Sequence, residues 1–277
     1  MPDCNPFLNL RGHSCNVASV VFHPQSTVSL ERSELNLASC SMDGAVKLWN
    51  LESEAPIADV EGHSPHRVSR VEFHPSGRFL ATCVFDNSWR LWDLEQGVEV
   101  LHQEGHSKPV YTLAFHTDGS VAVTGGMDSF GRVWDLRTGR CIMFMEGHLK
   151  SILSVDVSPN GYDIVTGSED NTCRVWDLRK RSCVYTIPAH TNLVSGVKFD
   201  PNGGQYLVSC SYDSTVKVII ALVFFSLFVP CHYFHYFRIF FMYIFVPILI
   251  FLSLQIRLKY LGARALRRKL IASTYRS

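Results

Sequence analysis

Short, mostly apolar runs separated by turn-forming residues fill the first 218 positions of the chain. Clusters of Pro, Asn, Asp, Ser and Gly at 74–77, 117–119, 159–161 and 201–204 separate runs of the length expected for β-strands. The pattern predicts four strands in each of four successive stretches and three strands in a fifth. The expected strands are 17–22, 37–41, 46–49 and 56–60; 68–73, 79–84, 88–92 and 98–102; 110–115, 121–125, 131–135 and 140–145; 152–157, 163–167, 173–177 and 182–187; and 194–199, 206–210 and 215–219.

The five stretches are copies of one repeat, with a usual period of 42 or 43 residues. The first four copies open with a Gly-His pair, and the fifth has Ala189-His190 in its place. In every copy an Asp follows in a tight turn. A Trp comes six residues after the Asp in the first four copies, whereas the fifth has Ile219 at this position. A period near 40 with these anchors is typical of WD repeats, which supply four strands to each blade of a β-propeller. The expected fold class is therefore all-β, a propeller of four full blades and a partial fifth.

A Ser or Thr precedes the turn Asp in every repeat and completes a recurring polar set. We expect the Asp to bind the His, the His to bind the hydroxyl, and the hydroxyl to accept the Trp N–H. The set resembles a Ser-His-Asp hydrolase triad, but its recurrence favours a structural network that satisfies buried polar groups. The four expected structural tetrads are His13, Ser39, Asp43 and Trp49; His63, Thr82, Asp86 and Trp92; His106, Thr124, Asp128 and Trp134; and His148, Thr166, Asp170 and Trp176.

Metal-ligating and redox motifs are weak in this sequence. Nine Cys are scattered without a Cys-x-x-Cys pair. His23, His74 and His116 occupy equivalent turns, where a role in the turn is favoured over metal binding. We therefore expect no catalytic residue, no cofactor and no metal site.

Two surfaces are candidates for binding a partner. The residue before the turn Asp is large and apolar in four of five repeats, as Met42, Phe85, Met127 and Tyr212. On the opposite rim, the turns between the third and fourth strands are acidic in the first two repeats and basic in the next two. The basic side chains, which would suit RNA or an acidic protein segment, are Arg137, Arg140, Arg179, Lys180 and Arg181.

The composition changes abruptly after Val218. Residues 1–218 hold 18 Lys plus Arg against 25 Asp plus Glu, a net charge of −7, whereas residues 219–277 carry +8 and no acidic residue. We predict that 1–218 is a partial propeller. The segment 219–277 is apolar and then basic, with helix as one available structure, and we expect it to be non-native, from a retained intron or a mis-predicted gene model. The alternative is a membrane anchor, because 239–256 is mostly apolar and a basic flank follows it.

Several long stretches resemble one family, the WD-repeat subunit of the U4/U6 small nuclear ribonucleoprotein (pre-mRNA processing factor 4). They are His74–Leu80, Ser88–Glu95, Leu101–His106, Phe130–Lys150 and Cys183–His190, and the resemblance covers about 7–218. It implies a seven-bladed family ring, a nuclear location and a non-enzymatic scaffold of the U4/U6 and tri-snRNP particles in pre-mRNA splicing. The implied partners are a partner splicing factor, a cyclophilin and the U4/U6 RNA.

Two other functions remain open at this point. Trp134–Arg137 and Trp176–Arg179 fit the Trp-Asp-x-Arg pattern of substrate receptors of cullin-type ubiquitin ligases. A WD-repeat membrane protein anchored by its tail is the other alternative, and a membrane is a partner only if that tail is native.

Overall fold

The chain is an all-β protein in its computed structural model, which describes residues 8–25, 35–201 and 203–220. Those ranges contain nineteen strands and no α-helix, so the predicted fold class is confirmed. No helix within them could cross a lipid bilayer. Beyond Ile220, the expected tail and the alternative membrane span at 239–256 lie outside the described residues.

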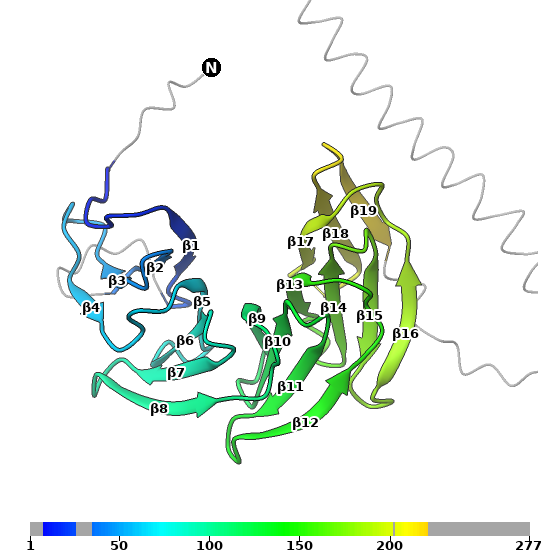
Figure 1. Ribbon diagram of the computed structural model, residues 1–277, viewed down its shortest axis with the longest axis horizontal. Helices are drawn as coiled ribbons and strands as arrows, with labels where there is room; N and C mark the ends of the chain where they lie inside the picture. Colours follow the sequence, from blue (N-terminus) through cyan, green and yellow to red (C-terminus); the bar gives the residue numbers. More distant parts are fainter. Residues whose placement is uncertain (1–7, 26–34, 202, 221–277) are drawn as a thin grey trace, which may run out of the picture. The chain divides into compact units, whose positions relative to one another are not determined.

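The strands form five antiparallel sheets, one for each repeat, and we call these sheets blades one to five (Figure 1). Blade one contains β1 (Val17–Phe22), β2 (Leu37–Ser41), β3 (Val46–Trp49) and β4 (Ala58–Val60). Blade two contains β5 (Val68–Phe73), β6 (Phe79–Val84), β7 (Trp89–Asp93) and β8 (Val98–Gln103). Blade three contains β9 (Val110–Phe115), β10 (Val121–Gly126), β11 (Gly131–Asp135) and β12 (Arg140–Met145). Blade four contains β13 (Ile152–Val157), β14 (Asp163–Ser168), β15 (Cys173–Asp177) and β16 (Ser182–Ile187). Blade five contains β17 (Val194–Phe199), β18 (Tyr206–Ser211) and β19 (Val216–Ile220).

The predicted strand positions agree closely with these bounds, and the main difference is that β4 begins at Ala58 instead of residue 56. Strand β19 runs to Ile220, two residues past the point where the composition changes. The third strand of blade five is therefore completed by Ile219 and Ile220, which pair with Leu207 and Tyr206.

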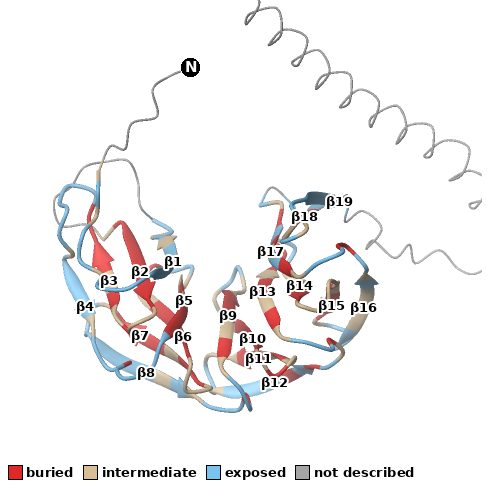
Figure 2. Cartoon of the chain, turned by 45° about the horizontal axis from the view of Figure 1, so that its top comes forward, coloured by how far each residue is buried: buried red, intermediate tan, exposed pale blue. Residues whose placement is uncertain are grey.

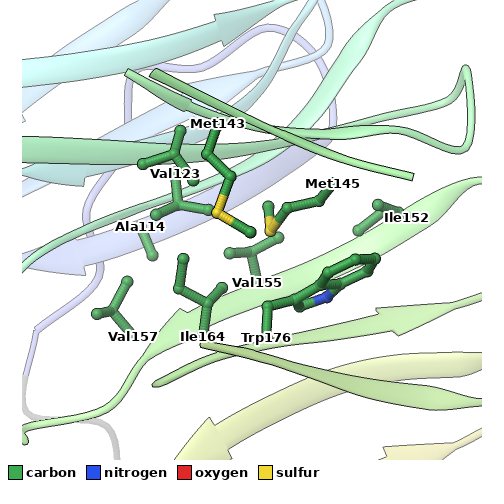
Figure 3. Packing of buried hydrophobic residues seen from close by; sticks show 10 residues of the cluster. Ala114, Val123, Met143, Met145, Ile152, Val155, Val157, Ile164 and Trp176 are labelled. Carbon is green, nitrogen blue, oxygen red and sulfur yellow. The ribbon is translucent and has the colours of Figure 1, made fainter. Parts of the chain in front are cut away.

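The hydrophobic core lies between successive blades. The first strand of each blade packs against the first strand of the next, in the order β1, β5, β9, β13 and β17. Figure 3 shows one such layer, in which Val123 and Met143 of blade three face Val155, Ile164 and Trp176 of blade four. Burying an aliphatic side chain stabilises a fold by about 1.5–3 kcal/mol, so these layers are the main attraction between blades.

The three turn histidines also join blade one to blade two, blade two to blade three, and blade three to blade four. Nε2 of His23 lies 3.0 Å from the Gly77 carbonyl oxygen, and Nε2 of His74 lies 2.8 Å from that of Gly119. His116 makes the same contact with Gly161 at 2.8 Å. We call these three pairs the latches. They place His23, His74 and His116 in turns, as expected, but their role between blades was not predicted.

Candidate partner-binding surface

The polar tetrad is complete in blades three and four. In blade three, Nδ1 of His106 lies 3.0 Å from Asp128 Oδ2, and its Nε2 lies 2.9 Å from Thr124 Oγ1. Trp134 donates its indole N–H to the same Thr124 oxygen at 2.8 Å. Blade four repeats the arrangement with His148, Asp170, Thr166 and Trp176, at 2.8, 2.7 and 2.9 Å for the three corresponding contacts.

Blades one and two differ from the expected tetrad, because their Asp does not bind their His. His13 still contacts Ser39 at 2.6 Å and His63 contacts Thr82 at 2.9 Å, and Trp49 and Trp92 donate to the same hydroxyls. Nδ1 of both histidines is buried without a hydrogen-bond partner. The expectation of four identical tetrads is therefore wrong for these two Asp–His pairs.

Competing partners hold the two aspartates away from the histidines. Asp43 accepts a hydrogen bond from Ser14 Oγ at 2.5 Å. Asp86 forms an ion pair with Arg90 at 2.7 Å. In addition, the loop between His63 and β5 is one residue longer than the equivalent loops of the other four blades. The local neighbours therefore decide which aspartates reach the histidines.

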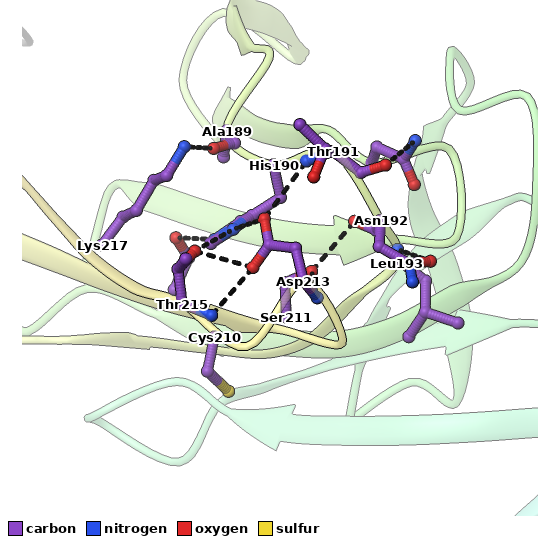
Figure 4. A network of polar contacts seen from close by, with 12 residues as sticks. Ala189, His190, Thr191, Asn192, Leu193, Cys210, Ser211, Asp213, Thr215 and Lys217 are labelled. Carbon is purple, nitrogen blue, oxygen red and sulfur yellow. Dashed lines mark hydrogen bonds and ion pairs between the residues drawn. The ribbon is translucent and has the colours of Figure 1, made fainter.

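Blade five keeps the network although it lacks the Trp. His190 lies 2.8 Å from Asp213 Oδ2 and 2.9 Å from Ser209 Oγ, as part of the cluster drawn in Figure 4. Thr215 donates its hydroxyl to Asp213 at 2.6 Å, and the ammonium group of Lys217 donates to the Ala189 carbonyl. Ile219, which replaces the Trp, packs instead against the hydrophobic cluster between blades four and five.

Burial and hydrogen bonds shift the pKa values of network side chains in blades two and four. Burial alone would raise the pKa of Asp170. Hydrogen bonds from Thr172 and His148 lower it by more than burial raises it, so the pKa falls to about 2. Burial lowers the pKa of His148, against the attraction of Asp170. In blade two, burial beside the Arg90 charge lowers the pKa of His63 to about 4. Ionised Asp170 and neutral His148 and His63 are therefore the stable forms around pH 7.

The networks hold together two loops at one end of each blade, and we call this end the Asp-turn rim. It consists of the turn after each second strand and the loop before each first strand. The backbone N–H of Phe85 donates to the Arg67 carbonyl at 2.9 Å, and that of Met127 donates to the Pro109 carbonyl at 2.9 Å. Equivalent bonds occur in the other three blades, from Met42, Glu169 and Tyr212.

The predicted apolar partner residues are all placed on this rim. Met42, Phe85 and Met127 are half-buried, whereas Tyr212 is 72% exposed. The fifth equivalent position is Glu169, also half-buried. The structure therefore puts the four apolar side chains at equivalent turns, three of them partly accessible and one open.

Three basic side chains of the same rim were missed by the sequence reasoning. Arg67, Lys108 and Lys150 are exposed on the loops before β5, β9 and β13, and none of them makes an ion pair with another described residue. Their signal in the sequence is a basic residue shortly after the Gly-His pair in three successive repeats. Arg67 and Lys108 lie on the loops that bond the Phe85 and Met127 turns, whereas Lys150 lies on the loop that bonds the Glu169 turn.

The basic turns lie at the other end of the blades, on what we call the latch rim. All five predicted basic side chains are exposed there. Arg179 is partly neutralised by Asp177 at 3.1 Å and stacks on Tyr162, whereas no ion pair joins Arg137, Arg140, Lys180 or Arg181 to the described residues. Arg78, in the turn before β6, is paired with Asp93 at 2.6 Å and Glu95 at 3.2 Å.

One hollow opens beside the basic turn of blade three. It has a volume of about 410 Å³ and is lined by Val121, Leu136, Arg137 and Ile142 among others. No group of three His, Cys, Asp or Glu side chains within the described ranges is arranged to hold a metal ion. The arrangement suits contact with a partner through projecting apolar and basic side chains.

Comparison with known proteins identifies the repeats. The model of the "WD domain, G-beta repeat" family matches residues 4–50, 54–93, 97–135, 139–177 and 181–219. The U4/U6 small nuclear ribonucleoprotein Prp4 of Bos taurus and that of Mus musculus are each 65% identical over 41 residues, which is 15% of this chain and 8% of those proteins. An uncharacterised WD repeat-containing protein of Schizosaccharomyces pombe is 42% identical over 70 residues, 25% of this chain and 15% of that protein. The matched stretches thus span a small part of these curated relatives.

Proposed function

We propose that this chain, which belongs to the WD-repeat family, has a spliceosomal role. In this proposal it is a non-enzymatic scaffold of the U4/U6 and tri-snRNP particles in the nucleus. WD repeats imply protein–protein interaction, and that coarser role follows from the family. The spliceosomal assignment is supported by one observation, the 65% identity with Prp4 over 41 residues. The implied partners are a partner splicing factor, a cyclophilin and the U4/U6 RNA.

The Asp-turn rim is the proposed protein-binding surface. It combines half-buried Met42, Phe85 and Met127, exposed Tyr212, and the exposed cations of the same rim, which are Arg67, Lys108 and Lys150. Aromatic and Met side chains are enriched in interface cores, and basic groups at the edge steer acidic partners. An acidic protein segment with apolar anchors fits this combination.

The latch rim is the proposed RNA-binding surface. Arg137, Arg140, Lys180 and Arg181 are exposed and lack ion-pair partners among the described residues, so their charges are available to phosphates. A cation that neutralises a phosphate releases bound counterions, so the affinity for RNA falls as salt rises. For single strands, the logarithm of the binding constant falls by about 0.7 per phosphate contact for each unit of the logarithm of the salt concentration. Removing these cations would lower both the RNA affinity and the slope.

Affinity purification of the full chain from nuclear extract tests the assignment. We expect U4 RNA, U6 RNA and spliceosomal proteins to co-purify. The charge-reversal variant Arg137→Glu/Lys180→Glu/Arg181→Glu should lose the RNA and keep the proteins, whereas Tyr212→Ala with Lys108→Glu should weaken the protein association.

The matched control reverses Arg78, which is already paired within its blade. Arg78→Glu should leave RNA recovery unchanged. Co-purification of a cullin adaptor without U4/U6 components would contradict the spliceosomal proposal and favour the ligase receptor.

A further inference from the structure

The first strand of each blade carries apolar side chains that pack on the preceding blade. In β5, β13 and β17 these positions are at most 8% exposed. They are Val68, Val71 and Phe73; Ile152, Val155 and Val157; and Val194, Val197 and Phe199. Strand β1 has the same side chains at the same positions, but Val17, Val20 and Phe22 are 49% to 63% exposed.

The surface that receives such a strand is equally regular. In blade one it consists of Ala38, Cys40, Val46 and Leu48, which are buried under β5. In blade four it consists of Val165, Cys173 and Val175, which are buried under β17. Figure 2 shows β2 and β3 of blade one in the colour of buried residues.

Blade five has the same receiving surface with nothing packed on it among the described residues. Val208, Val216 and Val218 occupy the equivalent positions of β18 and β19 and are 36% to 67% exposed. Figure 2 shows β19 mostly in the colour of exposed residues. The described part of the chain thus presents one unpacked first strand, β1, and one unpacked receiving surface.

These two surfaces are the halves of an interface that the chain builds four times internally. We propose that β1 of one copy packs on the β18–β19 surface of a second copy, head to tail. The occupant is a second copy because the internal interfaces already show this strand type packed on this surface type, with Val and Phe against Val and Cys. Contiguous exposed apolar patches of this kind mark association sites.

The contact differs from a two-fold symmetric dimer, because each copy contributes two different surfaces. Such heterologous contacts leave one free surface at each end and continue into longer oligomers unless the arrangement closes. The mass of the full chain should therefore increase with concentration, with little dependence on salt because the contact is apolar.

Two blocked variants separate this arrangement from other modes of association. Val20→Asp/Phe22→Asp disables the strand, and Val216→Asp/Val218→Asp disables the receiving surface. Each variant alone should be monomeric in sedimentation velocity. An equimolar mixture should form a complex of one copy of each that grows no further, since each partner supplies the surface that the other lacks.

The matched control is Val98→Asp/Val100→Asp on β8, whose side chains are similarly exposed but lie on the outer strand. It should associate as the unmodified chain does. All substituted side chains are already exposed, and formation of the mixed complex would itself show that both blocked variants are folded.

Three results would overturn the proposal. They are a monomeric unmodified chain at every concentration, self-association of either blocked variant, and a mixture that remains monomeric. The unmodified chain tests the proposal even if a blocked variant fails to fold. Because this experiment uses no RNA or spliceosomal protein, its outcome is independent of the proposed function.

Discussion

Removal of the Asp128 carboxylate isolates the contribution of a complete tetrad to stability. The side chain of Asp128 is 2% exposed, and it lies 3.0 Å from Nδ1 of His106. It also accepts the backbone N–H groups of Ser107 at 3.0 Å and Phe130 at 3.2 Å. In Asp128→Ala, the His106 ring would keep its contact with Thr124 and lose its partner at Nδ1.

The expected loss of unfolding free energy is about 2–4 kcal/mol. A buried polar group without a partner costs about 1–3 kcal/mol, and the His106 side chain is almost completely buried. The two backbone bonds to the carboxylate add about 1 kcal/mol, since water replaces them in part. Asp170→Ala should cost less, because the Thr172 hydroxyl lies 3.4 Å from Nδ1 of His148 and is able to replace the carboxylate.

Urea unfolding of the full chain measures the difference, provided that the dependence on urea stays unchanged between variants. The matched control is Asp43→Ala, which removes the equivalent carboxylate from a blade where it does not touch the histidine. That variant should lose about 1 kcal/mol. If Asp128→Ala loses no more than Asp43→Ala, the Asp–His contact contributes nothing and the structural reading of the tetrad fails.

Two further predictions concern the imidazole of His63 and the turn glycine of a latch. The pKa of His63 is about 4 in the folded chain against an ordinary 6.5, so the unfolded chain binds the proton first as pH falls. The free energy of unfolding should therefore fall by about 3 kcal/mol between pH 6.5 and 4 because of this residue. The variant His63→Gln should lose less stability over the same range. Gly119→Ala should lower the melting temperature more than Gly97→Ala, because both glycines have φ near +70° but a Cβ at Gly119 overlaps the His74 ring, whereas no atom lies within 4 Å at Gly97; equal losses would contradict the steric part.

The strands were predictable because each blade repeats the same local pattern. Apolar runs and turn signals are properties of neighbouring residues, so they located nearly every strand to within one or two residues. The same reasoning expected four equal tetrads. It was wrong for Asp43 and Asp86 because competition from Ser14 and Arg90 depends on geometry that the repeat pattern does not encode.

The candidate surfaces were predictable only in part. Met42, Phe85, Met127 and Tyr212 share one turn position, so their common rim followed from the repeat. The latches escaped notice because each joins residues about one full repeat apart, through a backbone carbonyl that has no side-chain signature. The ion pairs of Arg78 with Asp93 and Glu95 likewise depend on side-chain geometry that the repeat pattern does not encode.

The latches make a blade directional as a building unit. Blades two and three each give a histidine to the blade after them and a glycine carbonyl to the blade before them, as His74 and Gly77 do for blade two. A blade grafted between two others must therefore bring both residues to restore both joints. A graft that carries only the glycine would join its predecessor and leave its successor loose, so the order of repeats could be rearranged in engineered chains while these two positions are kept.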